Sequence, residues 1–232
     1  MAQVYALKLD EEINETPFRL LSTKISKEKK ERVETFYRRE DALRTLFSEL
    51  LLRYILRKFV GLQNETISFL YSDYGKPSLK NFPQLHFNLS HSGEWIVCAT
   101  DTHPIGIDIE QIQPIDLSIA EHYFSEKEKQ QLFSLPPWAQ LSFFFELWTL
   151  KESFIKQKGK GLSIPLNSFT VSLTPEQPIT LEENGNRLPL FFKQYQPDNA
   201  YKMAVCGRND SFGDIGIIPL TSLIHYFIAE AP

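Results

Sequence analysis

The sequence predicts an α+β protein made of two similar halves, with a functional site in the cleft where the halves meet. Segments with strand-like alternation and segments with helical periodicity are mixed along the chain. A helical stretch at 46–62 leads into a strand-like segment, and so does a similar stretch at 143–162, which aligns Glu49 with Glu146. If this similarity between the two segments is a true internal repeat, it implies two α+β halves with a cleft between them. Chance similarity between two amphipathic helices is the alternative.

The first half begins with an alternating strand at 4–9, which a long helical stretch follows. Ser26 is a candidate cap for a helix that begins at Lys27, and Asp41 is a candidate cap for a separate helix at 42–59. The later elements are expected in this order: a strand at 66–72, turns at 73–83, a hairpin at 85–101 with its turn at Ser92-Gly93, and a strand at 105–110.

The second half is dominated by one long helix with an aromatic face. It is expected to begin near Pro137 and to end at Gly159-Lys160-Gly161, since glycine is the usual residue after a helix. Two short helices at 117–124 and 125–133 precede it. Strands are expected after it at 169–173, 188–195, 201–207 and 216–220.

Composition narrows the class of protein. The chain has 232 residues and a formal net charge of −4, which argues against a general nucleic-acid binder. Its start has no signal-peptide pattern, and no apolar run reaches the roughly 18 residues of a membrane span. Cys98 and Cys206 lie in short apolar runs without metal-type spacing, as reduced core cysteines do. We therefore expect a cytoplasmic protein that binds neither nucleic acid nor membrane.

Two carboxylates stand close together in the segment "GIDIE". On a strand, Asp108 and Glu110 share one face, while Ile107 and Ile109 point to the other. Two like charges side by side repel unless a cation joins them, and magnesium favours such oxygen ligands. Solvated carboxylates at a sheet edge are the alternative interpretation.

The long helix carries a charged stripe. Trp148, Glu152 and Lys156 follow one another at four-residue spacing, so they lie on one face. Lys151 and Lys158 are expected to add positive charge nearby, as is Lys160. An ordinary surface ion pair between Glu152 and Lys156 is the alternative.

The segment "FNLSHSGEW" places Ser90 next to His91. Neighbouring residues of a strand point to opposite faces, which argues against a Ser-His nucleophilic pair and favours binding of an anionic ligand. A structural role for His91 remains open.

Basic residues gather between 27 and 44, where a solvated helix face is the alternative. Arg44 differs because it lies in an apolar pattern, where its charge needs a partner such as a phosphate.

Taken in order, "FNLSHSGEW", "IGIDIE" and "WTLKESFIKQKGKGL" resemble the phosphopantetheinyl transferase family, in its surfactin-type (Sfp-type) branch, which activates nonribosomal peptide synthetases. The resemblance covers nearly the whole chain and is strongest at 74–165. It implies a pseudo-dimer of two α+β halves with the active site between them. The halves are then expected at 1–103, with the coenzyme A adenine and 3′-phosphate contacts, and at 104–232, with the metal ligands, the catalytic helix and the docking surface.

The resemblance also implies roles for individual residues. Asp108, Glu110 and Glu152 match magnesium ligands. The positions that match coenzyme A contacts are Lys29, Arg32 and Arg44 near the 3′-phosphate, Ser90 and His91 at the phosphates, Gly75, Lys76 and Pro77 beside the adenine, and Lys156 near the pyrophosphate.

The implied reaction is attack of a carrier serine hydroxyl on the β-phosphorus of coenzyme A, with adenosine 3′,5′-bisphosphate as the leaving group. Glu152 is the candidate base, either directly or through a metal-bound water, and Lys156 would stabilise the departing phosphate. The apo carrier protein is expected to dock on about residues 159–190 of a monomer. Two alternatives are a magnesium-dependent nucleotide phosphodiesterase and a non-catalytic coenzyme A-binding module.

Overall fold

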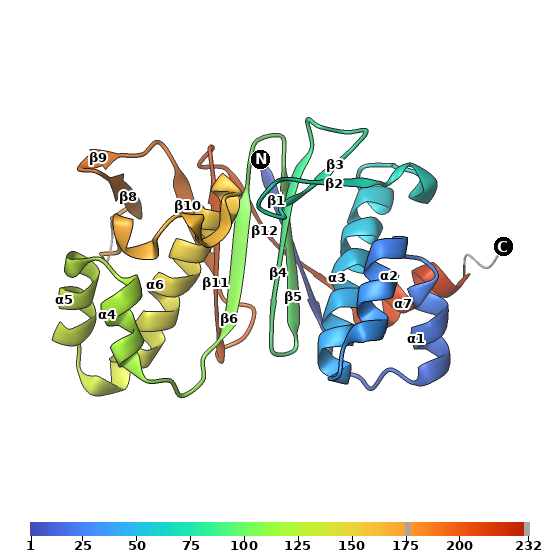
Figure 1. Ribbon diagram of the computed structural model, residues 1–232, viewed down its shortest axis with the longest axis horizontal. Helices are drawn as coiled ribbons and strands as arrows, with labels where there is room; N and C mark the ends of the chain where they lie inside the picture. The colour runs from blue at the N-terminus through green and yellow to red at the C-terminus, as the bar shows by residue number, and fades with distance from the viewer. Residues whose placement is uncertain (175–176, 230–232) are drawn as a thin grey trace.

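Two β-sheets lie side by side in the middle of the molecule, and helices cover the outer side of each, as the computed structural model shows (Figure 1). The structure describes residues 1–174 and 177–229. This arrangement confirms the predicted α+β fold with two halves. No helix in these two ranges is long and apolar enough to cross a membrane.

The sheet of the first half has four strands. Their order across the sheet is β12 (Phe212–Ile218), β1 (Ala2–Lys8), β5 (Trp95–Asp101) and β4 (His86–Ser92). β12 runs parallel to β1, and the other neighbours are antiparallel. The helices on its outer side are α1 (Glu15–Ser22), α2 (Lys27–Thr35), α3 (Arg39–Lys58) and α7 (Leu220–Ala229).

The sheet of the second half has three antiparallel strands in the order β10 (Phe191–Tyr195), β11 (Tyr201–Gly207) and β6 (Gly106–Gln111). Its outer helices are α4 (Ala120–Tyr123), α5 (Glu126–Ser134) and α6 (Pro137–Lys158). Smaller sheets flank the two halves: β2 (Phe69–Tyr71) with β3 (Pro77–Leu79), and β7 (Phe169–Ser172) with β8 (Thr180–Glu183) and β9 (Asn186–Arg187).

Three apolar cores hold these layers together. One lies between the first sheet and its helices, and a second lies between the second sheet and α6. The third joins the two sheets, where Val4 and Val97 of one half meet Ile107 and Val205 of the other. Because burial of apolar side chains is the main stabilising term in folding, this third core fixes the two halves against each other.

The last segment of the chain returns to the first half. β12 extends the first sheet beside β1, and α7 contributes Leu220, Leu223 and Phe227 to the first core. Residues 212–229 therefore pack with the N-terminal half, although the expected division assigned all of 104–232 to the other one. Neither α7 nor α1 was expected from the sequence, and β3, β8 and β9 were also missed.

The start of the long helix α3 differs from the expectation. The helix begins at Arg39 after an extended residue, Arg38, so Asp41 lies in its first turn and does not cap it. The Asp41 carboxylate instead accepts a hydrogen bond from Arg44, at 2.6 Å. The helix at Lys27 begins as predicted, but the Ser26 hydroxyl donates to Glu49 and makes no capping bond.

Strands β4 and β6 face each other across the junction of the halves without backbone pairing. Every second side chain of β4 reaches β6: the Asn88 Oδ1 accepts from the Ile107 N–H at 2.8 Å, and the Ser90 hydroxyl donates to Asp108 at 2.9 Å. This alternation holds β6 in a fixed register against β4.

Candidate active site in the cleft between the halves

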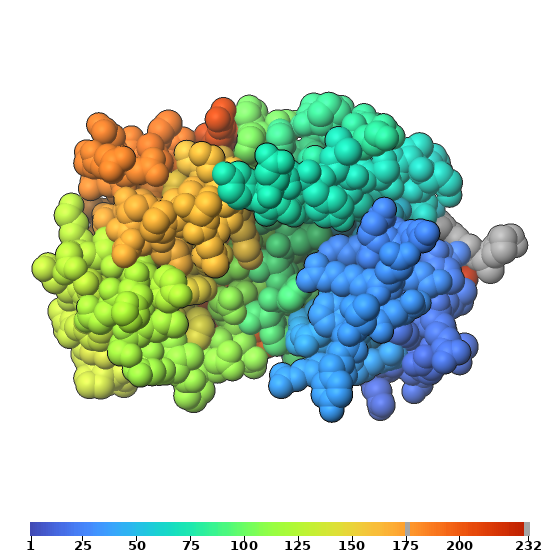
Figure 2. Space-filling view, viewed as in Figure 1, coloured from blue at the N-terminus to red at the C-terminus, as the bar shows by residue number. Residues whose placement is uncertain are grey.

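A cleft of about 450 Å³ lies between the two halves, and Figure 2 shows it as a hollow between the N-terminal helices and the lobe that contains α4 to α6. Both halves contribute to its walls. The lining side chains that bear on chemistry are Lys29 and Arg32 from α2, Ser48 from α3, Ser90 and His91 from β4, Asp108 and Glu110 from β6, and Trp148, Glu152 and Lys156 from α6. The cleft thus brings together most of the residues singled out in the sequence.

The wall formed by α2 is cationic. Lys29 and Arg32 lie one turn apart and both face the cleft. Burial, and then the charge of Arg32, lower the pKa of Lys29 below its ordinary value. Two cations held this close favour an anionic ligand such as a phosphate, which would relieve their repulsion.

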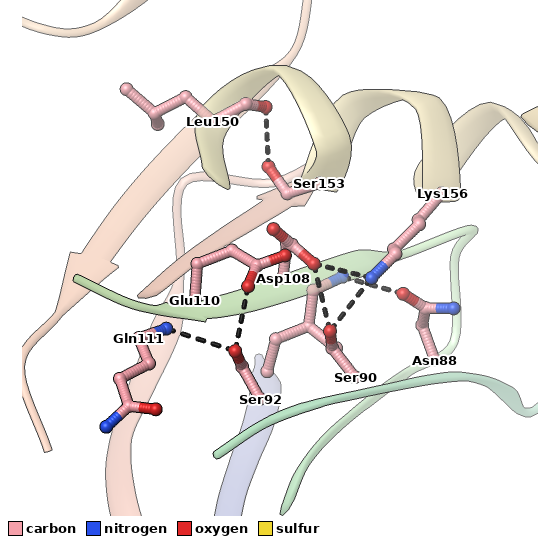
Figure 3. A network of polar contacts seen from close by, with 10 residues as sticks. Asn88, Ser90, Ser92, Asp108, Glu110, Gln111, Leu150, Ser153 and Lys156 are labelled. Carbon is pink, nitrogen blue, oxygen red and sulfur yellow. Dashed lines mark hydrogen bonds and ion pairs between the residues drawn. The ribbon is translucent and has the colours of Figure 1, made fainter. Parts of the chain in front are cut away.

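The opposite wall is acidic, and Figure 3 shows its centre. Asp108 is almost completely buried, and its Oδ1 accepts from Ser90 and from the Lys156 ammonium. Its Oδ2 is buried and has no hydrogen-bond partner among the residues that the structure describes. Burial raises the pKa of Asp108, and the Lys156 charge opposes this shift. A buried carboxylate oxygen with no partner is costly, so it marks a place for a further cation or donor.

Glu110 and Glu152 flank this aspartate. Burial, and then the nearby Asp108, raise the pKa of Glu110 to about 7. The same two causes raise the pKa of Glu152 above its ordinary value. Ser92 donates to Glu110 at 2.8 Å. Within residues 1–174 and 177–229, no three acidic, histidine or cysteine side chains stand close enough together to bind a metal ion as they are arranged.

The residues nevertheless fit a divalent cation. Asp108 Oδ2 has no partner, and the negative charge of Asp108 raises the pKa of both Glu110 and Glu152. A hard cation with oxygen ligands would relieve that repulsion.

The charged stripe of α6 faces the cleft as predicted, but its pairing differs. Lys156 bonds Asp108 and Ser90, the latter at 2.9 Å, and forms no ion pair with Glu152 among the described residues. Strand β6 lies directly under α6. The Asp108 carboxylate of β6 is therefore nearer to Lys156 than the Glu152 carboxylate, which lies one turn back along the helix.

Lys151 does not add charge to the site, which corrects the expectation for this residue. Its side chain is fully buried on a different face of α6, where it pairs with Glu128 at 2.7 Å and donates to the Phe169 carbonyl at 2.9 Å. One residue along a helix is a rotation of about 100°, so the neighbour of Glu152 points into the second core.

Ser90 and His91 are separated as the strand geometry predicts. Ser90 is buried and bonds Asp108, whereas His91 lies in the more open, cationic part of the cleft. Partial burial, and then the charges of Arg44 and Lys156, lower the pKa of His91.

Arg44 has protein partners. Its guanidinium donates to Asp41 at 2.6 Å and to the Gly93 carbonyl at 3.1 Å. The sequence argument that this charge needs a partner was correct, but the partner in the structure is a carboxylate.

The turn that contains Gly75, Lys76 and Pro77 reaches the cleft only in part. Pro77 lines the cleft, and Gly75 occupies a left-handed conformation (φ 79°) within the turn. The Lys76 side chain does not line the cleft and donates instead to two carbonyl groups at the end of α6 and to the carbonyl of Ile105.

Sequence reasoning missed the polar side chains that support the site. Ser48 and Thr45 of α3 line the cleft, and Asn88 both lines it and bonds β6. The alternation of Asn88, Ser90 and Ser92 in a strand was a detectable signal, because three polar residues on one face need partners.

The sequence matches two descriptions of one enzyme family. Residues 104–206 match the 4′-phosphopantetheinyl transferase superfamily, and residues 13–103 match the N-terminal region of 4′-phosphopantetheinyl transferase.

Individual relatives agree with this. The chain is 40% identical over 223 residues to the 4′-phosphopantetheinyl transferase Sfp of Bacillus subtilis, which covers 96% of this chain and 100% of the relative. It is 47% identical over 184 residues to psf-1 of Bacillus pumilus, with 79% of each chain covered. It is 40% identical over 220 residues to gsp of Aneurinibacillus migulanus, with 95% of this chain and 92% of the relative covered.

The fold with two halves, the cleft shared by both and these long matches lead to one assignment. Transfer of phosphopantetheine to a carrier protein, rather than simple hydrolysis or binding, is the activity of this family. The chain therefore belongs to the 4′-phosphopantetheinyl transferases of the Sfp type, which transfer the 4′-phosphopantetheine group of coenzyme A to carrier proteins.

Proposed function

We propose that the cleft between the halves is the active site of this transferase. The observation that carries the proposal is the convergence of a cationic wall and a buried acidic centre on one cavity, with residues from both halves. The carrier serine oxygen attacks the β-phosphorus of coenzyme A and forms a new P–O bond. The bond from that phosphorus to the bridging oxygen breaks, and adenosine 3′,5′-bisphosphate leaves.

The cationic wall binds the nucleotide end of coenzyme A. Lys29, Arg32 and His91 hold the 3′-phosphate, and Arg44 adds positive charge beside His91 while Asp41 and Gly93 fix its position. Pro77, which follows Gly75 and Lys76, offers an apolar surface to the adenine.

Asp108, Glu110 and Glu152 would hold a magnesium ion. The buried, unpartnered Oδ2 of Asp108 supports this assignment, as does the crowding of negative charge around it. When bound, magnesium supplies positive charge that stabilises the pyrophosphate as its bond breaks.

Glu152 and Lys156 carry the proton and charge changes. Glu152 lines the cleft and accepts the proton of the carrier serine. Lys156 reaches both Ser90 and Asp108, so its ammonium lies where it can stabilise the departing phosphate. Ser90 keeps the lysine and the aspartate in register.

Carrier docking is proposed on about residues 159–190. Leu162 is 73% exposed just beyond α6, and Lys158 and Lys160 are exposed beside it. Leu166, by contrast, is buried in the second core. An exposed apolar residue flanked by lysines suits an acidic partner with an apolar contact. Residues 175–176 of this surface lie outside the described residues.

One chain supplies both walls of the cleft, which supports a monomeric enzyme. Residence in the cytoplasm stays a prediction, and the two buried free thiols, Cys98 and Cys206, support it.

The test follows the mass of an apo carrier incubated with coenzyme A, with magnesium present or removed by a chelator. We expect a mass gain with magnesium and none after chelation, while the circular dichroism spectrum of the enzyme stays unchanged. Transfer that survives exhaustive chelation would exclude the metal assignment. Cleavage of coenzyme A without carrier would point to hydrolysis.

A further inference from the structure

The side chain of Lys76 joins the two halves at the far end of the catalytic helix. Its ammonium donates to the carbonyl oxygens of Ile105 at 3.1 Å, Gln157 at 3.3 Å and Lys156. Lys76 belongs to the turn between β2 and β3 of the first half, whereas all three carbonyls belong to the second half. An ammonium group has three N–H donors, so these three bonds use its full capacity.

This contact provides hydrogen-bond donors for carbonyl groups at the C-terminal end of α6. The last carbonyls of an α-helix lack partners within the helix, and the negative end of the helix dipole lies there. Lys156 and Gln157 are in the last turn of α6, so Lys76 caps the helix with a positive charge from another part of the chain. Burial of the amine lowers the pKa of Lys76 to about 8.

One glycine makes room for the lysine, and another lets β6 approach α6. A side chain at Gly159 would place its Cβ 2.9 Å from the Lys76 Cδ, and Gly159 also has a left-handed backbone (φ 72°). A Cβ at Gly106, at the start of β6, would lie 2.0 Å from the Ser153 carbonyl oxygen. The lysine stem and the first residue of β6 therefore pack directly against the last turns of α6.

The three joined segments all lead to the cleft. Ile105 lies three residues before Asp108 on β6, and the Lys156 carbonyl belongs to the residue whose ammonium bonds that aspartate. Pro77, next to Lys76, lines the cleft itself. One ammonium group thus ties the nucleotide side of the cleft to the strand and the helix that hold the acidic centre.

We propose that Lys76 is a positioning residue for the transfer reaction: by its three carbonyl bonds it sets the place of Lys156 and Glu152 relative to Asp108 and to the bound coenzyme. The inference rests on the proposed active site. It concerns the side chain of Lys76, which bonds these three carbonyls and is not among the residues that line the cleft.

The first experiment compares Lys76→Met with Lys76→Arg and with the control Lys80→Met, an exposed lysine of the same region. Misplacement of reacting groups by about an ångström can lower a rate roughly a hundredfold. We expect kcat of Lys76→Met to fall roughly ten- to a hundredfold, a larger change than that in KM for coenzyme A. Arginine should restore part of kcat because it keeps the charge and several donors. Lys80→Met should behave as wild type.

A second variant keeps the test independent of the stability of Lys76→Met. Gly159→Ala pushes against the lysine stem and should lower kcat through the same contact. In the double variant, the two losses should be strongly less than multiplicative, as for groups that act as one unit. Circular dichroism and thermal melting verify that each variant is folded. If Lys76→Met does not fold, the positioning role is tested by the kcat values of Lys76→Arg and Gly159→Ala alone.

The proposal is overturned if folded Lys76→Met keeps kcat within about twofold of wild type, or if the losses of Lys76→Met and Gly159→Ala multiply. A parallel measurement on Glu152→Gln separates this failure from failure of the active site: if Glu152→Gln is inactive while Lys76→Met is fully active, only the positioning role is lost. If Glu152→Gln is fully active, the proposed site itself is wrong.

Discussion

The two long helices, α3 and α6, occupy equivalent places behind their sheets but use their charges differently. On α3, Glu49 and Arg53 pair with each other at 2.8 Å and are 3% and 5% exposed, so their charges are satisfied inside the first half. On α6, Glu152 faces the cleft, and Lys156 reaches across to Ser90 of the other half. The same architecture therefore carries structural charges on one side and charges available to a substrate on the other.

The largest expected effect tests whether the charges of α6 act on the substrate. Glu152→Gln should lower kcat roughly a hundred- to ten-thousandfold, the range for loss of a general base, with little change in stability. The matched control is Glu146→Gln on the same helix, whose carboxylate bonds Gln194. Steady-state transfer rates on one apo carrier measure both. Equal rates for the two variants would contradict the role of Glu152.

Arg53→Met tests whether the charges of α3 are structural. It removes the ion-pair partner of the buried Glu49, which keeps its hydrogen bonds from Ser26, and the free energy of unfolding should fall by about 3–5 kcal/mol. The folded fraction should keep its kcat. The control, Arg19→Ala, breaks an exposed pair with Glu15 at the same four-residue spacing and should cost less than about 1 kcal/mol. Urea unfolding curves give both values, and a large loss of kcat in folded Arg53→Met would erase the contrast between the helices.

His91→Ala should weaken coenzyme A binding roughly ten- to a hundredfold, since a charge-assisted hydrogen bond contributes about 1.5–3 kcal/mol. With dephospho-coenzyme A, which lacks the 3′-phosphate, wild type and His91→Ala should bind with nearly the same affinity. Isothermal titration on both ligands measures this. A loss of equal size on both would assign His91 to another part of the coenzyme.

The smallest effect concerns the carrier. Reversing the charges of Lys158 and Lys160 to glutamate should raise KM for the carrier several-fold, more at low salt, and leave coenzyme A affinity unchanged. The comparison variant is Ile119→Asp at the rim of the neighbouring hollow that Glu110 and Trp148 also line, where Ile115 and Ile119 are exposed. If only Ile119→Asp raises the carrier KM, the docking surface lies at that rim.

Local sequence patterns predicted the parts of the site that depend on the spacing of nearby residues along one strand or one helix. The spacing of Asp108 and Glu110 on a strand and the stripe of Glu152 and Lys156 on a helix both place their side chains in the cleft. The end of α6 at Gly159 also follows from a local rule, since a left-handed residue there favours glycine.

Contacts between distant segments escaped prediction. Lys76 and the Lys156 carbonyl that it bonds are 80 residues apart in the sequence, and no periodicity of the sequence predicts a contact at that separation. Lys151 was misread because its buried partner, Glu128, belongs to another helix. In both cases the sequence shows a charge, but its partner depends on tertiary packing.

The return of β12 and α7 to the first half has a consequence for how the protein is made. β1 pairs with β12, so the first half contains two segments that lie about 200 residues apart in the sequence. A growing chain that stops before residue 212 leaves one edge of β1 unpaired and the first core without Leu223 and Phe227. Such an open edge strand invites aggregation or proteolysis. Completion of the N-terminal half therefore awaits synthesis of residues 212–229, and a chain truncated before them lacks part of the core behind the cationic wall.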